Sequence, residues 1–147
     1  MNGTGDRSRI LYLFIAILSL AGVVVSAISL QRHYAKSATT YCDFTQHFNC
    51  DIVNRSEYSE IQGIPVAGIG VAGYAFLFFL STFRRFRADT PNLLLTAALA
   101  GFAFALYLTY VEAYRLFTWC ILCLTSQALI FLILLLSAGA KLRTAKA

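Results

Sequence analysis

The sequence predicts an all-α integral membrane protein, a four-transmembrane-helix bundle forming a single domain over residues 1–147. Of its 147 residues 59% are hydrophobic and only 13% are charged, too few charges for a soluble domain of this size. Four apolar stretches are long enough to cross a hydrocarbon core of roughly 30 Å, which takes about 20 helical residues. None of them contains Asp, Glu, Lys or Arg, so no charge enters lipid. The predicted spans are residues 10–30, 64–83, 93–111 and 119–137.

The first stretch also resembles a secretory signal peptide, because Arg7 and Arg9 precede its apolar run. That run is long for a signal peptide, and no clear small-x-small cleavage site follows it. Its removal would also leave an odd number of spans. We therefore interpret residues 10–30 as an uncleaved helix.

The basic residues predict the orientation, because Lys and Arg in short loops stay on the cytoplasmic side. They concentrate in the two chain ends and in the loop between the second and third spans, whereas the other two loops mix basic with acidic residues. The cytoplasmic set is Arg7, Arg9, Arg84, Arg85, Arg87, Lys141, Arg143 and Lys146. Both termini are then cytoplasmic. The net charge of +5 is accounted for by this topology and does not indicate nucleic-acid binding.

The outer loop, residues 31–63, carries Cys42 and Cys50. Phe44, Phe48 and Ile52 recur there at helical spacing, which predicts a short amphipathic segment on the membrane surface. Such a segment would carry the cysteines toward the other outer loop. An outer face permits disulfides, whereas the cytosol keeps thiols reduced.

The second cysteine pair is Cys120-Ile-Leu-Cys123, at the start of the fourth predicted span. Sulfurs three residues apart on a first helical turn are close enough to bridge. Unpaired amide N–H groups and the positive end of the helix dipole stabilise a thiolate there. Trp119 is placed as an interfacial anchor. The spacing and position favour a reactive dithiol over buried structural cysteines.

Two other interpretations of the cysteines stay open at this level. A permanent disulfide between Cys42 and Cys50 could simply staple the outer loop. Alternatively, all four sulfurs with His33 or His47 could bind zinc, although seven intervening residues make a poor zinc knuckle.

The order of these motifs resembles the vitamin K epoxide reductase family, in a bacterial-type stand-alone form. The matching features run from Tyr41 to Gln127 and are Cys42 and Cys50, Ser56 and Tyr58, Gly63-Ile-Pro65, Gly70-Val-Ala-Gly73-Tyr74, and Cys120-Ile-Leu-Cys123-Leu-Thr125. The animal vitamin K enzymes carry an asparagine and a tyrosine where this chain has Val66 and Gln127.

The resemblance implies a membrane thiol-quinone oxidoreductase of the bacterial inner (plasma) membrane. Cys123 would face a quinone, ubiquinone or menaquinone, and Cys120 would exchange disulfides with Cys50. Cys42 would receive electrons from a thioredoxin-like or DsbA-like protein on the outer side. Because no thioredoxin-like domain follows the last span, we expect that partner to be a separate protein.

Polar side chains near the outer ends of the spans are the candidate quinone contacts: Ser56, Tyr58, Thr125 and Gln127. The alternatives are a DsbB-type disulfide oxidase, in which the C-x-x-C pair precedes the loop pair, and a non-enzymatic membrane protein with structural disulfides or a metal-capture site.

Overall fold

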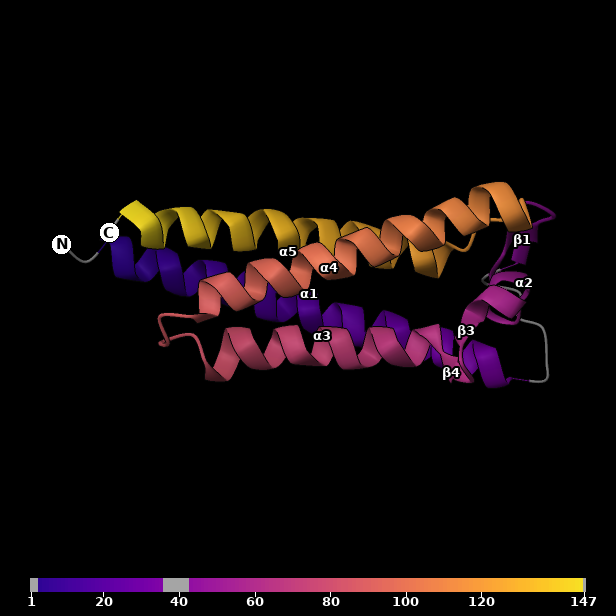
Figure 1. Ribbon diagram of the computed structural model, residues 1–147, viewed down its shortest axis with the longest axis horizontal. Coiled ribbons are helices and arrows are strands. Elements are labelled where there is room, and N and C mark those ends of the chain that lie inside the picture. The colour runs from indigo at the N-terminus through magenta and orange to yellow at the C-terminus, as the bar shows by residue number, and fades with distance from the viewer. Residues whose placement is uncertain (1–2, 36–42, 147) are drawn as a thin grey trace.

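Four long helices lie side by side in the computed structural model, which describes residues 3–35 and 43–146 (Figure 1). They are α1 (Gly3–Tyr34), α3 (Val66–Phe83), α4 (Thr90–Val111) and α5 (Ile121–Lys146). Each contains one predicted span or nearly all of it, and each is long and apolar enough to cross a membrane. The predicted four-helix membrane bundle is therefore confirmed.

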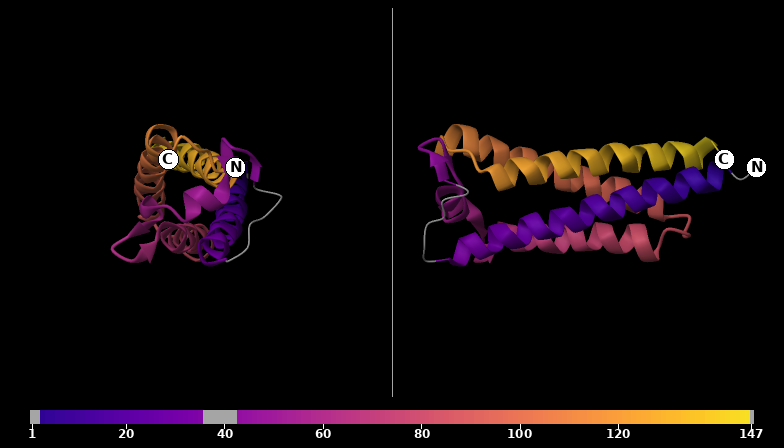
Figure 2. Two further views of the ribbon diagram at one scale, coloured as in Figure 1. Left: turned by 90° about the vertical axis from the view of Figure 1, so that its right-hand side faces the viewer. Right: turned by 180° about the vertical axis from the view of Figure 1, so that it is seen from behind.

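The helices form a ring in which α1 packs on α3 and α5, and α4 packs on α5 and α3 (Figure 2). Large apolar side chains cover the outside of this ring, among them Leu13, Phe79 and Leu135, which are 59%, 47% and 53% exposed. Apolar side chains directed outward are expected where lipid is the surrounding solvent. The packed core lies inside the ring and includes Ile15, Leu94 and Ile133, all fully buried.

The two ends of the bundle differ in charge and in structure. One end, called here the basic end, holds both ends of the described chain and the connection between α3 and α4 (Figure 1). All eight residues of the predicted cytoplasmic set belong to these segments. The other end is covered by residues 43–65, called here the cap.

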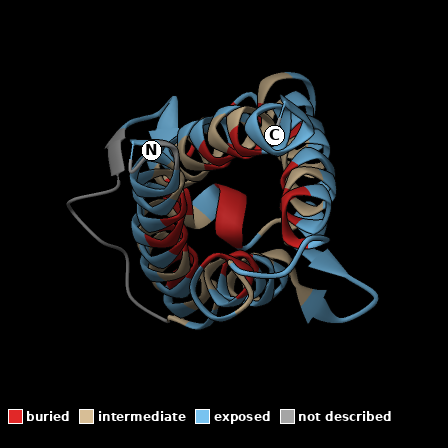
Figure 3. Cartoon of the chain, turned by 90° about the vertical axis from the view of Figure 1, so that its left-hand side faces the viewer, coloured by how far each residue is buried: buried red, intermediate tan, exposed pale blue. Residues whose placement is uncertain are grey.

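The cap contains short elements: β1 (Asp43–Thr45), β2 (Phe48–Asn49), α2 (Cys50–Asn54), η1 (Glu57–Ser59), β3 (Glu60–Ile61) and β4 (Ile64–Pro65). Strands β3 and β4 form a hairpin whose two-residue turn, Gln62-Gly63, has positive φ at both positions. That backbone is the one two-residue hairpins favour. Viewed along the bundle from the basic end, α2 lies across the middle of the ring (Figure 3).

The predicted amphipathic helix through Phe44, Phe48 and Ile52 is only partly correct. Phe44 and Phe48 lie in the antiparallel strands β1 and β2, and helix begins only at Cys50. The physical reason is that Phe48 also pairs with Trp119, so backbone hydrogen bonds to a distant segment hold it extended. Similarly, Ile64 and Pro65 belong to β4, and α3 begins at Val66.

Candidate functional site

A backbone bridge brings the two cysteine segments together. Phe48 and Trp119 form a parallel bridge in which Trp119 N donates to His47 O at 2.7 Å and Asn49 N donates to Trp119 O at 3.1 Å. Cys50 comes two residues after Phe48 and Cys120 comes directly after Trp119, and each stands at the start of a helix. Backbone pairing thus sets the two cysteines side by side, independently of any bond between their sulfurs.

The sulfurs have different states and surroundings. Cys50 is disulfide-bonded, whereas Cys120 and Cys123 are free thiols. Cys42 lies outside the described residues. Cys50 and Cys120 are both fully buried in one cluster with Val53, and Cys123 is partly buried at the edge of that cluster.

The start of α5 polarises the Cys120 thiol. A hydrogen bond from the Cys123 side chain holds the pKa of the Cys120 thiol below its usual value, and the backbone N–H groups of Leu122 and Cys123 act in the same direction. Burial and the nearby Glu112 carboxyl oppose the shift without reversing it. Thiolate stabilisation by a helix N-terminus is the effect that the C-x-x-C spacing predicts.

Glu112 is a functional candidate that the sequence did not reveal. Sequence analysis left it among the mixed charges of an outer loop, but the carboxyl is buried, with 2% of the residue exposed. It begins the π-helical turn η2 (Glu112–Leu116), which continues α4 past the predicted span end at Val111. Its Oε2 accepts a hydrogen bond from Cys120 N at 3.1 Å. Its position eight residues before Cys120, next to a span end, was the one signal available.

A cavity of about 370 Å³ lies inside the ring beneath the cap. Most of its wall is apolar, and its polar side chains come from α1, from the cap, from α3 and from the ends of α4 and α5 near the cap. Cys123 and Glu112 line it, whereas Cys120 does not. Tyr74 lines it from α3 and donates from its hydroxyl to Ser126 O on α5 at 2.7 Å, which ties two helices together between the cavity and the core.

Comparison with known proteins gives a family match. The model of the Vitamin K epoxide reductase family matches residues 13–138, which is most of the chain. The chain belongs to the vitamin K epoxide reductase family. Members of this family are membrane oxidoreductases that connect thiols with a quinone carrier, and in general they pair with thioredoxin-like proteins. No curated protein matches the chain significantly.

Family membership decides between the two enzymatic interpretations of the sequence, against the DsbB-type oxidase. Among residues 3–35 and 43–146, no three His, Cys, Asp or Glu side chains gather as metal ligands, and Cys42, one of the proposed zinc ligands, lies outside this range. His33, another of the proposed zinc ligands, is bound instead to cap residues.

The four predicted quinone contacts divide into two groups. Ser56 and Tyr58 line the cavity from the cap, and Ser56 Oγ donates to Val53 O at 2.9 Å. Thr125 is exposed and donates to Ile121 O at 2.7 Å, and it does not line this cavity.

Gln127, the fourth predicted contact, also stands outside the cavity wall. Its Oε1 accepts a hydrogen bond from Thr109 Oγ1, and Thr109 does line the cavity. Gln127 is therefore placed one side chain away from the cavity.

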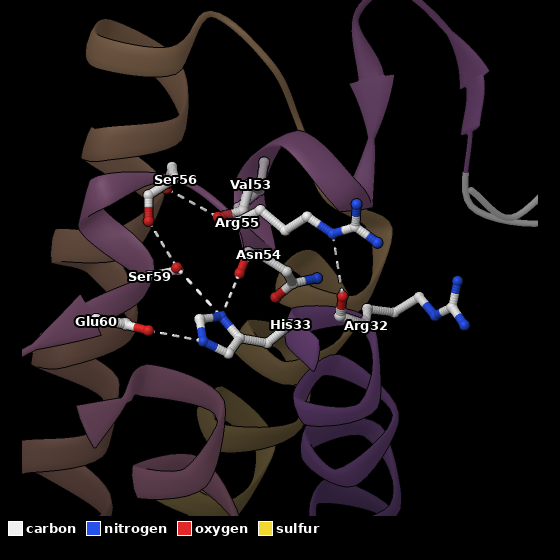
Figure 4. Close-up of polar contacts among 8 residues, drawn as sticks. All are labelled: Arg32, His33, Val53, Asn54, Arg55, Ser56, Ser59 and Glu60. Carbon is white, nitrogen blue, oxygen red and sulfur yellow. Dashed lines mark hydrogen bonds and ion pairs between the residues drawn. The ribbon is translucent and has the colours of Figure 1, made fainter. Parts of the chain in front are cut away.

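A polar network around His33 fixes the cap over the cavity (Figure 4). Nδ1 of His33 lies 2.6 Å from the carbonyl oxygen of Asn54, and Nε2 lies 2.9 Å from Glu60 Oε1. Arg55 Nε adds a bond to Arg32 O at 3.5 Å. The end of α1, which extends past the predicted span, thus fastens the segment that carries Cys50.

Proposed function

We propose that this protein oxidises a separate thioredoxin-like protein on the outer side of the membrane and passes the electrons to a quinone. The electrons would move from Cys42 and Cys50 to Cys120 and Cys123. The observation that carries the proposal is the division of surroundings within the second pair. Cys120 packs in the buried cluster with Cys50, whereas Cys123, one helical turn later, lines the cavity.

Transfer between the pairs proceeds by attack of a thiolate on a disulfide. Cys50, reduced through Cys42, attacks the Cys120 sulfur of a Cys120–Cys123 disulfide, and Cys123 leaves as a thiolate. Cys42 then attacks Cys50, which restores the loop disulfide and releases Cys120. The lowered pKa of the Cys120 thiol favours this last step, because a more acidic thiol leaves faster.

The acceptor supplies the other half of the redox balance, since a quinone takes up two electrons and two protons to become a hydroquinone. The cavity fits such a molecule in size, because ligand pockets span about 300–1,000 Å³. Its apolar wall suits a quinone ring, and the hydroxyl groups of Ser56 and Tyr58 are candidates to bind the carbonyl oxygens. Thr125 and Gln127 remain candidate contacts, although neither lines this cavity. The acceptor would be ubiquinone or menaquinone.

The orientation proposed here places the cap on the periplasmic or extracellular face of a bacterial inner membrane. The eight basic residues at the other end support cytoplasmic termini through the positive-inside rule. An outer cap would meet an oxidising compartment in which a disulfide at Cys50 persists. The unbonded sulfurs of Cys120 and Cys123 support a reactive dithiol over permanent disulfides, which are one form of the non-enzymatic alternative.

The test is quinone reduction by the protein purified in detergent, followed by quinone absorbance with a reduced thioredoxin-like protein as donor. We expect turnover in the wild type and none in Cys123→Ala, because that variant lacks the sulfur that lines the cavity. Thr144→Ala, at the basic end of the same helix, serves as the control and should match the wild type. Unchanged quinone turnover in Cys123→Ala would contradict the proposal.

A further inference from the structure

Glu112 contacts the backbone of Cys120 and the side chain of Cys123, and it also lines the cavity. Its Oε2 accepts the backbone N–H of Cys120 at 3.1 Å, and its carboxyl group hydrogen-bonds the side chain of Cys123. Cys123 hydrogen-bonds Cys120 in turn. A continuous line of three acidic groups therefore runs from the buried cysteine cluster to the cavity wall.

The number of hydrogens along this line is limited by the chemistry of the groups. A thiol has one hydrogen, so Cys123 cannot donate to both neighbours at once. If Cys123 donates to a Cys120 thiolate, the bond between Cys123 and Glu112 needs its hydrogen from a protonated carboxyl. The arrangement Glu112–COOH, Cys123–SH, Cys120–S⁻ satisfies both bonds with two protons on three groups.

The charges around Glu112 make a purely structural ion pair a poor explanation. Neither of the two ion pairs recorded among residues 3–35 and 43–146 involves Glu112. The other titratable groups that line the cavity are His33 on α1, Tyr58 in the cap, Tyr74 on α3 and Cys123 on α5. Arg115, in the same π-helical turn, is exposed. A buried carboxyl without a cation is costly to keep ionised, which favours proton uptake when charge develops beside it.

We propose that Glu112 is a catalytic acid and base that moves protons between the Cys120–Cys123 pair and the quinone. This inference rests on the proposed function. Starting from Glu112–COOH, Cys123–SH and Cys120–S⁻, the Cys120–Cys123 bond forms and the sulfurs give up two electrons. Glu112 transfers its own proton to the quinone and then transfers the proton that Cys123 releases. The quinone thus gains two electrons and two protons. Glu112 is left as a carboxylate, and the total charge of the site is unchanged.

Reduction of the pair by an incoming dithiol reverses the proton movement at Glu112. The dithiol supplies two electrons and two protons and becomes a disulfide. One proton goes to Cys123 and one to the Glu112 carboxylate, while Cys120 stays a thiolate. Glu112 should therefore become protonated whenever the Cys120–Cys123 disulfide is reduced, whether or not a quinone is present.

Infrared difference spectra of the quinone-free protein test this directly. On reduction of the disulfide by a small dithiol we expect a carboxylic acid C=O band to appear and to shift in D₂O. The band should be absent from Glu112→Gln and present in Glu57→Gln, which makes the same change at an exposed position of the cap. No band in the wild type, or the same band in Glu112→Gln, would overturn the proposal, and the wild-type result does not depend on how any variant folds.

Quinone reduction by the same small dithiol gives the second measurement. Glu112→Gln keeps an oxygen that can accept the Cys120 N–H but cannot carry a proton, so we expect its turnover to fall by about 100-fold or more. If Glu112 only anchors the start of α5, Glu112→Gln should retain wild-type turnover, and that result would overturn the inference. Glu112→Asp, which keeps a carboxyl, should recover part of the lost rate. A wild-type protein that reduces no quinone would refute the proposed function instead, while the infrared result would still stand for Glu112.

Discussion

Cys120 and Cys123 lie one helical turn apart in α5, yet they face different surroundings. Cys120 is fully buried against Cys50 and the cap, and Asn54 Nδ2 approaches its sulfur at 3.9 Å. Cys123 lines a mostly apolar cavity between the helices. The start of one helix therefore presents two nearby thiols to two different surroundings within the same protein. A donor side and an acceptor side can then be altered separately.

The largest effect should come from removing the entry point on the donor side. We expect Cys42→Ala to abolish quinone reduction driven by a thioredoxin-like protein, because the proposed path of electrons from that donor to Cys120 passes through Cys42. A small membrane-permeant dithiol should still support turnover, since it can reduce the Cys120–Cys123 pair without the loop cysteines. The measurement is quinone absorbance with each donor in turn. Equal loss with both donors would show that the two sides are not separable and that Cys42 is not the shuttle.

A second experiment examines the hydrogen bond between the two cysteines. Because Cys123 is the main cause of the lowered pKa of the Cys120 thiol, Cys123→Ala should raise that pKa. In the protein with its C-x-x-C pair reduced, alkylation of Cys120 should begin at a lower pH than that of an ordinary thiol, whose pKa is about 8.5. In Cys123→Ala the same pH profile should move upward.

The profile is obtained with a small permeant alkylating reagent and peptide mass spectrometry, comparing midpoints and not rates because Cys120 is buried. Thr125→Ala, which changes the next turn of α5 without touching the cysteine pair, is the control. An unchanged midpoint in Cys123→Ala would mean that the helix start alone sets the acidity of Cys120.

The sequence predicted the parts of the fold that depend on solvent and not on distant contacts. Apolar runs without charges predicted the four spans, and the basic residues predicted which loops share an end of the bundle. The C-x-x-C spacing placed Cys120 and Cys123 at a helix start. These features follow from the transfer of local segments into lipid and from the geometry of one helical turn.

Features that arise from contacts between distant segments could not be predicted in this way. The bridge between Phe48 and Trp119 joins residues 71 positions apart and turns a predicted helix into a strand. The burial of Glu112 depends on α4 continuing as a π-helical turn under Cys120. His33 reaches the cap because α1 extends beyond the apolar run that predicted it. Each of these contacts involves a residue outside the predicted spans, where an apolar pattern gives no information.

The smallest predicted effect concerns the helix that carries Cys50. Asn49 is the N-cap residue of α2, and its Oδ1 accepts the backbone N–H of Ile52 at 3.0 Å. Loss of an N-cap hydrogen bond costs about 1 kcal/mol of helix stability. Helix α2 has only five residues, so its placement of Cys50 against Cys120 should weaken, by roughly fivefold in the population of the aligned state. Asn49→Ala should therefore slow turnover with the thioredoxin-like donor several-fold. Turnover with the small dithiol should not change.

Asn92→Ala is the matched control for this variant, because Asn92 is an exposed asparagine near the start of α4 at the basic end of the bundle. It should leave both rates at the wild-type level. A slower rate with both donors in Asn49→Ala would show that the Asn49 side chain affects the cavity as well as the position of Cys50. The donor-specific loss, in contrast, would mean that alignment of Cys50 with Cys120 is a separate requirement from the chemistry at Cys123, as their different surroundings indicate.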